Sequence, residues 1–99
     1  GPAYFFLFME ALQDAARELG LSKEIAKTLV YQTATGAAEL AIRSEDDICE
    51  LRQKVTSPGG TTEQALNQFE EDGLRETVKR ALASARARSI ELAKEFGNN

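Results

Sequence analysis

Apolar residues recur every three or four positions through most of the chain, a spacing typical of amphipathic helices. The first such stretch begins at Pro2, which suits the first turn of a helix, and runs to Leu19, where Gly20 can end it. The pattern predicts four more helices, at about 22–43, 44–55, 62–72 and 74–96. No segment alternates as a strand does. The predicted fold class is therefore all-α, a helical bundle of about five helices.

Two of these helices have more apolar surface than a small bundle can cover. The stretch "AYFFLFM" makes the first two turns of the first helix apolar on every side, so we expect them to be buried against more than one neighbour. The later half of the second helix, "TATGAAELA", is mostly small and apolar, and Gly36 permits close approach of another helix. We expect both helices to be enclosed in an intertwined homodimer; the alternative is a tightly packed bundle of one chain.

Charge and hydropathy exclude several kinds of partner. The chain has 12 Lys and Arg against 16 Asp and Glu, a net charge of -4, which is the wrong sign for binding nucleic acid or an anionic membrane. The apolar opening is interrupted by Glu10 and is far shorter than the roughly 20 residues of a membrane-spanning helix. We therefore expect no nucleic acid and no membrane among its partners.

The residue inventory also limits the chemistry. With no His and only Cys49, the chain cannot form an internal disulfide, the usual zinc sites, or a catalytic arrangement that needs a histidine. A lone thiol fits a reducing, cytoplasmic location, and Cys49 is predicted to be a small, partly buried side chain. The carboxylates of the segment 45–50 are predicted to cap a short helix and not to hold a metal ion.

One loop, "VTSPGGTTEQAL" at 55–66, interrupts the helical pattern. Pro58 should end the preceding helix, and Gly59 and Gly60 allow positive φ angles and the close approach of another group. Thr61 or Thr62 can be the N-cap of the next helix; if Thr61 is the cap, Gln64 can complete a capping box. Glycines, hydroxyls and a helix N-terminus together can receive a carboxylate or phosphate. The alternative is a loop that only turns the chain.

Two motifs carry a resemblance to a known family: "GPAY" at 1–4 and "VTSPGGTT" at 55–62, separated by a helix that contains "TGAAEL". They resemble the C-terminal domain of pyrroline-5-carboxylate reductases, and the resemblance extends through "LNQFEEDGLRETVKRALASARARSIEL" over essentially all 99 residues. It implies an all-helical dimerisation and substrate-binding domain, similar to the C-terminal domain of 6-phosphogluconate dehydrogenase, that follows an N-terminal Rossmann domain. The implied assembly is a homodimer or a decamer built as a pentamer of dimers.

The resemblance also implies an activity and its residues. The parent enzyme is an oxidoreductase of proline biosynthesis, which reduces 1-pyrroline-5-carboxylate to L-proline with NADPH or NADH. In that family the loop receives the substrate carboxylate, and the matching residues here are Ser57, Gly59, Gly60, Thr61 and Thr62. Thr62 is the candidate catalytic residue, because it would donate a hydrogen bond to the ring nitrogen as that atom gains electron density.

The chain departs from the family pattern in three places. The Rossmann domain is absent, so we expect a piece of a longer protein that binds no cofactor by itself and is inactive alone. A serine that usually precedes "GPAY" is missing, and residues 47–49 are Asp-Ile-Cys where many members have His-Pro-Gly. Two other functions stay open: a stand-alone helical protein-interaction module without a catalytic role, and a helical domain of a related dehydrogenase with a different substrate.

Overall fold

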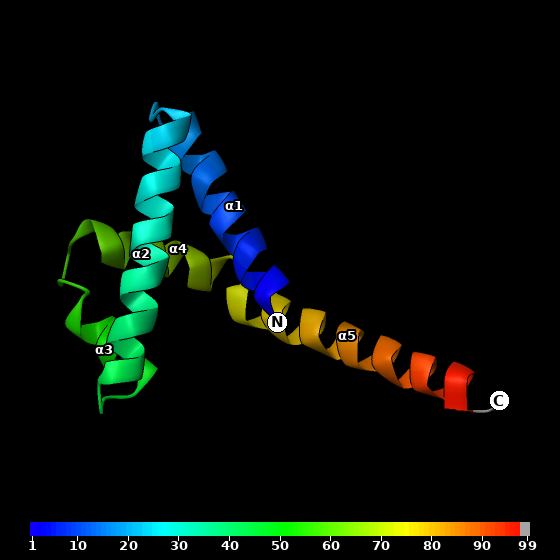
Figure 1. Ribbon diagram of the computed structural model, residues 1–99. Coiled ribbons are helices and arrows are strands. Elements are labelled where there is room, and N and C mark those ends of the chain that lie inside the picture. Colours follow the sequence, from blue (N-terminus) through cyan, green and yellow to red (C-terminus); the bar gives the residue numbers. More distant parts are fainter. Residues whose placement is uncertain (98–99) are drawn as a thin grey trace. The chain divides into compact units, whose positions relative to one another are not determined.

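The computed structural model describes residues 1–97, which form five helices and no strand. The helices are α1 (Pro2–Glu18), α2 (Lys23–Arg43), α3 (Ile48–Lys54), α4 (Thr61–Glu71) and α5 (Leu74–Gly97) (Figure 1). This confirms the predicted all-α class and the number of helices. The chain divides into two compact units, residues 1–52 and a second unit that begins at Gln53.

The ends of α1 and the start of α2 follow from local chemistry. Gly20 has a φ of 104°, a left-handed conformation that glycine adopts readily, and α1 ends two residues before it. Ser22 then caps α2, because its side-chain oxygen accepts a hydrogen bond from the N–H of Ile25 at 3.2 Å. Both signals were read correctly from the sequence.

In the first unit, α1 and α2 run side by side in opposite directions (Figure 1). Their shared core is small: of the residues described, only Ala26 and Val30 are buried, at 1% and 8% exposure. Both helices thus keep uncovered surface within one chain, which contradicts the alternative of a tightly packed bundle of one chain; their enclosure in a homodimer stays a prediction. The physical reason is that each helix of a pair can cover only one side of the other.

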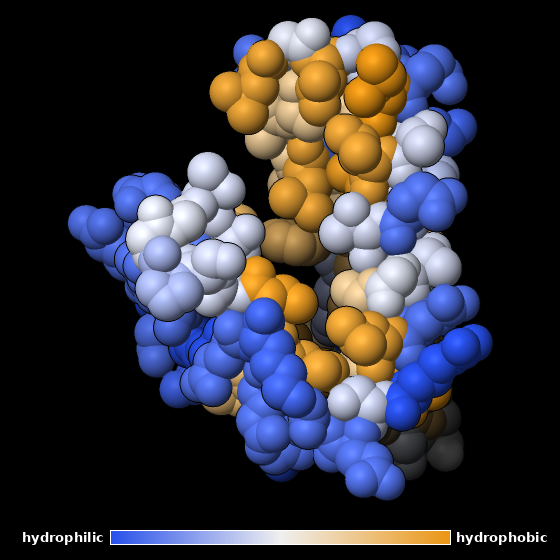
Figure 2. Space-filling model, turned by 90° about the vertical axis from the view of Figure 1, so that its left-hand side faces the viewer, coloured by the Kyte–Doolittle hydropathy of each residue, from blue (hydrophilic) through white to orange (hydrophobic). Residues whose placement is uncertain are grey.

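Part of the uncovered apolar surface of the first unit lies on the first turns of α1. Phe5 is 72% exposed and Leu7 is 67% exposed, so the first two turns are not buried against several neighbours within one chain. Gly36 on α2 would meet no atom within 4 Å if it carried a Cβ, so its small size serves no contact in a single copy. Figure 2 shows apolar side chains gathered at the upper end of the molecule, where Figure 1 places the turn between α1 and α2. Exposed apolar side chains there include Leu19, Leu21 and Ile25.

A groove of about 710 Å³ lies between α1 and α2. Its lining is mostly apolar and comes from the exposed turns of α1 and the middle of α2: Ala3, Phe6, Leu7, Met9, Glu10, Gln13, Tyr31, Ala34 and Thr35. An open apolar groove beside exposed aromatic side chains is the kind of surface that another helix can fill.

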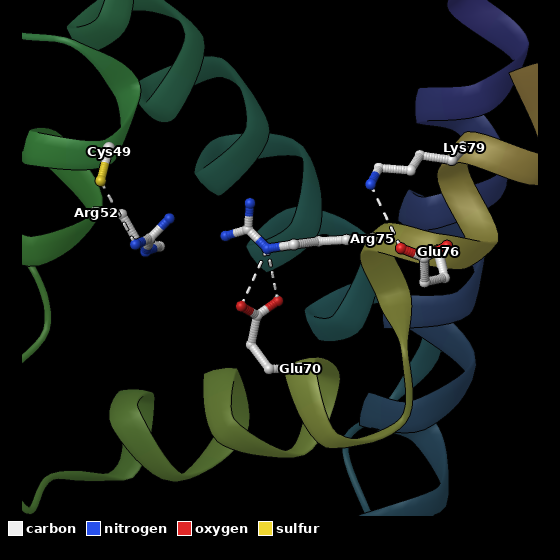
Figure 3. A network of polar contacts seen from close by, with 6 residues as sticks. All are labelled: Cys49, Arg52, Glu70, Arg75, Glu76 and Lys79. Carbon is white, nitrogen blue, oxygen red and sulfur yellow. Dashed lines mark hydrogen bonds and ion pairs between the residues drawn. The ribbon is translucent and has the colours of Figure 1, made fainter.

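The second unit contains α4 and α5, which contact each other across a tight turn. Gly73 sits in that turn with a φ of 80°, as its predicted role as a helix stop requires. Beside the turn, Arg75 of α5 points at Glu70 of α4, and its Nε donates to both carboxylate oxygens at 2.9 and 3.0 Å (Figure 3). Both side chains are largely exposed, so this ion pair contributes little to stability.

The segment around α3 differs from expectation. Cys49 is exposed instead of partly buried, and Arg52 Nη2 donates to its Sγ at 3.6 Å (Figure 3). Before α3, the Ser44 hydroxyl accepts a hydrogen bond from the N–H of Asp46 at 3.0 Å. Among residues 1–97 no helix is long and apolar enough to cross a membrane.

Candidate anion-binding loop

The loop before α4 is a tight turn built from its Pro-Gly-Gly sequence. The N–H of Gly60 donates to the carbonyl of Ser57 at 3.0 Å, which closes a four-residue β-turn over residues 57–60. Pro58 occupies the second position and Gly59, with a φ of 72°, the third. This is the residue pattern of a type II turn, in which the third residue needs a positive φ. The sequence thus predicted correctly that the chain turns at Pro58 and that Gly59 would have a positive φ.

Gly60 has a different role from the one expected. Its φ is -86°, so it does not need glycine's left-handed freedom. What it needs is small size, because a Cβ there would lie 3.1 Å from the Ser57 carbonyl oxygen and 3.4 Å from the Ser57 Cβ. The close approach expected of this glycine is therefore made within the turn itself.

Helix α4 begins one residue earlier than the threonines suggested. Its N-cap is Gly60, which has no side chain to cap with, so the prediction of Thr61 or Thr62 as N-cap and of Gln64 as capping-box partner is wrong. With Gly60 as cap, the third helical position falls on Glu63, and Glu63 Oε1 accepts a hydrogen bond from the N–H of Gly59 at 3.2 Å. This is a displaced capping box: the N–H of Gly60 is already used in the turn, so the carboxylate takes the preceding one.

The loop keeps several donors for a ligand. The helix proper starts its hydrogen bonding at Gln64, whose N–H donates to the carbonyl of Gly60 at 3.2 Å. The N–H groups of Thr61, Thr62 and Glu63 precede that bond, and the first turn of a helix has no helical acceptor for them. Gly59 and Gly60 are different, because their N–H groups are both engaged inside the loop. The donors that an anion could use are therefore the first N–H groups of α4 and the hydroxyls beside them.

The turn brings the site residues named from the sequence into one short segment. Ser57 and Gly60 are joined by the turn's hydrogen bond, and Thr61 and Thr62 form the first two positions of α4. Ser57, Thr61 and Thr62 are exposed, so their hydroxyls are open to a ligand. The partial positive charge of the α4 N-terminus favours an anion at this end. The arrangement can bind and orient a carboxylate, and it contains no strong base.

Glu63 is the residue of this loop that the sequence reading missed. The available signal was Glu63 itself, three residues after Gly60, which is the spacing of a capping box. That signal was hidden because the two threonines that follow have side-chain oxygens that can cap a helix, and glycine has none. Among residues 1–97 no group of three His, Cys, Asp or Glu side chains could hold a metal ion.

The structure defines the class of protein: a small all-helical chain that has a glycine turn in front of one helix and an exposed apolar pair of helices. The family model described as pyrroline-5-carboxylate reductase dimerisation matches residues 1–92. The chain therefore belongs to the pyrroline-5-carboxylate reductase dimerisation family, as the resemblance of its motifs indicated.

Curated relatives agree with this family. A pyrroline-5-carboxylate reductase of Pseudomonas aeruginosa is 53% identical over 97 residues, which cover 98% of this chain and 36% of the relative. One from Vibrio alginolyticus is 48% identical over 96 residues, covering 96% of this chain and 35% of the relative. The chain thus spans about a third of the length of these relatives and aligns with their C-terminal portion.

Solved structures lead to the same family. A pyrroline-5-carboxylate reductase from Coxiella burnetii matches with a TM-score of 0.89 and 55% identity over 93% of this chain and 34% of that chain. A pyrroline carboxylate reductase of Plasmodium falciparum with NADP bound matches with a TM-score of 0.87 and 39% identity, covering 90% of this chain and 35% of that chain.

Proposed function

We propose that these 99 residues are the C-terminal dimerisation and substrate-binding domain of a pyrroline-5-carboxylate reductase, which reduces 1-pyrroline-5-carboxylate to L-proline. The observation that carries the proposal is the turn and helix start at residues 57–62, which leave free donors inside the segment matched by the family model. The full activity belongs to a longer protein in this proposal, because the chain spans about a third of its relatives. The proposed location is the cytoplasm.

The substrate's carboxylate is the part that the loop would hold. A carboxylate offers two charged acceptor oxygens, and charge-assisted hydrogen bonds to such oxygens contribute about 1.5 to 3 kcal/mol each. In the proposal the Ser57 hydroxyl and the N–H groups of Thr61 and Thr62 donate to it. Gly59 and Gly60 contribute shape, because their own N–H groups are used within the loop.

Thr62 is the proposed catalytic residue. During reduction of the C=N bond the ring nitrogen gains electron density, and a hydroxyl that donates to it stabilises that change. A neutral hydroxyl is too weak an acid to protonate the nitrogen by itself, so its role is to orient and polarise, with water as the source of the proton. Thr62 is exposed and stands in the first turn of α4, next to the donors assigned to the carboxylate.

The cofactor in this proposal is NADPH or NADH, which supplies the hydride. The residues described here do not fit it, because a dinucleotide site of the Rossmann type needs a strand before its glycine-rich turn and residues 1–97 contain none. We propose that another part of the reductase binds the nicotinamide and that the 99-residue chain alone does not catalyse the reduction.

The proposed assembly is a homodimer through α1 and α2, or a decamer made of five such dimers. Support comes from the exposed aromatic turns of α1, the apolar groove beside them and the open space at Gly36, all in one unit. A second copy of the same surface would supply the helices that one chain lacks. Multi-angle light scattering of the 99-residue chain should give the mass of a dimer or a multiple of it; a folded monomer would refute the assembly and favour the stand-alone module.

The activity is tested with Thr62→Ala in the complete reductase. Loss of the hydrogen bond to the ring nitrogen should lower kcat by about 10- to 100-fold, while thermal stability changes little because the side chain is exposed. Thr62→Ser is the matched control, since it keeps the hydroxyl and should retain most of the activity. Equal kcat for all three enzymes would remove Thr62 from the mechanism.

A further inference from the structure

The backbone N–H of Gly59 has an acceptor that the proposed substrate site does not explain. Gly59 has a φ of 72° and is exposed. Two N–H groups of the turn donate hydrogen bonds within the described residues: Gly60 to the Ser57 carbonyl, and Gly59 to the Glu63 carboxylate. The first closes the turn, and the second connects the turn to the helix.

We propose that Glu63 is a positioning residue for the substrate loop, an inference that rests on the proposed function. Its carboxylate ties Gly59 to the first turn of α4, and Gly59 belongs to the turn that the Gly60 N–H closes on the Ser57 carbonyl. Glycine loses more conformational freedom on ordering than any other residue, so a loop that contains it binds weakly unless it is ordered beforehand. The tie performs that ordering before the substrate arrives.

The charge of Glu63 acts in the opposite direction. The carboxylate stands in the first turn of α4, at the same helix end as the proposed substrate carboxylate. Two negative groups at one helix end repel each other, so the charge lowers affinity for the substrate while the hydrogen bond raises it. A substitution that keeps the acceptor oxygen and removes the charge therefore separates the two effects.

Two variants of the complete reductase test the role. Glu63→Ala removes both the charge and the tie, whereas Glu63→Gln removes the charge alone. KM for 1-pyrroline-5-carboxylate should therefore be about threefold to tenfold higher in the Ala variant than in the Gln variant, as expected for losing one exposed hydrogen bond, with kcat nearly unchanged. Glu63→Gln keeps an oxygen that can accept from Gly59, and KM should stay at or below that of the unsubstituted enzyme. Equal KM values for the Ala and Gln variants in active enzymes would overturn the proposal, and so would a Gln variant with a higher KM than the unsubstituted enzyme.

A second readout does not depend on activity. In the 99-residue chain, NMR should show faster hydrogen exchange of the Gly59 amide in Glu63→Ala than in the unsubstituted chain or in Glu63→Gln, because only the Ala variant lacks an acceptor. Equal exchange in all three chains would refute the tie. No reduction by the unsubstituted complete protein would refute the proposed function instead, so the two failures are distinguishable.

Discussion

Replacing Gly59 by alanine places a Cβ on a residue whose φ is 72°. No atom lies within 4 Å of that Cβ position, so the substitution causes no clash and its cost comes from the backbone alone. An L-residue in the left-handed region costs about 1 to 2 kcal/mol. Alanine also restricts the unfolded chain, which returns about 0.4 to 1 kcal/mol. The expected net loss is about 1 kcal/mol, provided that the turn keeps its conformation.

The assay is urea unfolding of the 99-residue chain, followed by far-UV circular dichroism. The urea concentration at the unfolding midpoint should fall for Gly59→Ala. The slope of the free energy of unfolding against urea concentration should stay the same, because the folded state keeps its compactness. Gly59→Asn is the matched control: asparagine enters the left-handed region more readily, so its loss should be smaller. In the complete reductase the Ala variant should also raise KM, since the turn carries the proposed substrate loop.

The outcome that refutes this reasoning is an Ala variant as stable as the unsubstituted chain, or more stable. Such a result would mean that Gly59 does not need a positive φ and that the turn over 57–60 is not of type II. Stability lost equally by Ala and Asn would mean that the cost lies in the side chain's surroundings and not in the backbone angle.

Two further predictions concern the helices. Gly36→Leu should leave the fold of a single chain intact, since nothing lies within 4 Å of its Cβ position, but it should weaken the proposed dimer. If light scattering finds an unchanged mass with the fold intact, Gly36 does not lie at a contact between copies. Arg75→Gln should lower the free energy of unfolding by less than about 1 kcal/mol, because both partners of its ion pair with Glu70 are largely exposed. A larger loss in urea unfolding would show that this pair holds α4 and α5 together.

Helix ends that depend on one residue and its neighbours could be predicted from the sequence. The stops at Gly20 and Gly73 and the cap at Ser22 were predicted correctly, because each depends on one residue and its immediate neighbours in the chain. The start of α4 was missed by one residue. Two caps competed within a single loop, and the choice depended on where the N–H of Gly60 found its acceptor.

The site shows the same division. From the sequence, the loop at 57–62 could be recognised as a turn before a helix with hydroxyls and amides, and the family resemblance supplied its expected ligand. Which amides stay free could not be read from the sequence, because that depends on the acceptor that each N–H meets in the folded turn: the N–H of Gly59 meets Glu63 and that of Gly60 meets the Ser57 carbonyl. The role of Glu63 could not be read from the sequence either, because it follows from the hydrogen bond that its carboxylate accepts from the N–H of Gly59.

The sequence by itself determined the all-α class, the five helices and the family, because hydrophobic periodicity, stop residues and motifs are written in residue order. Burial was decided only by the tertiary structure. The first turns of α1 have the composition of a core, yet they are exposed. Burial depends on which other helices are within reach, and in the first unit α2 covers one side of α1. The hydrogen-bond donors that the loop offers also depend on the folded turn. In that turn the N–H groups of Gly59 and Gly60 have acceptors within the loop, whereas the first N–H groups of α4 stay available.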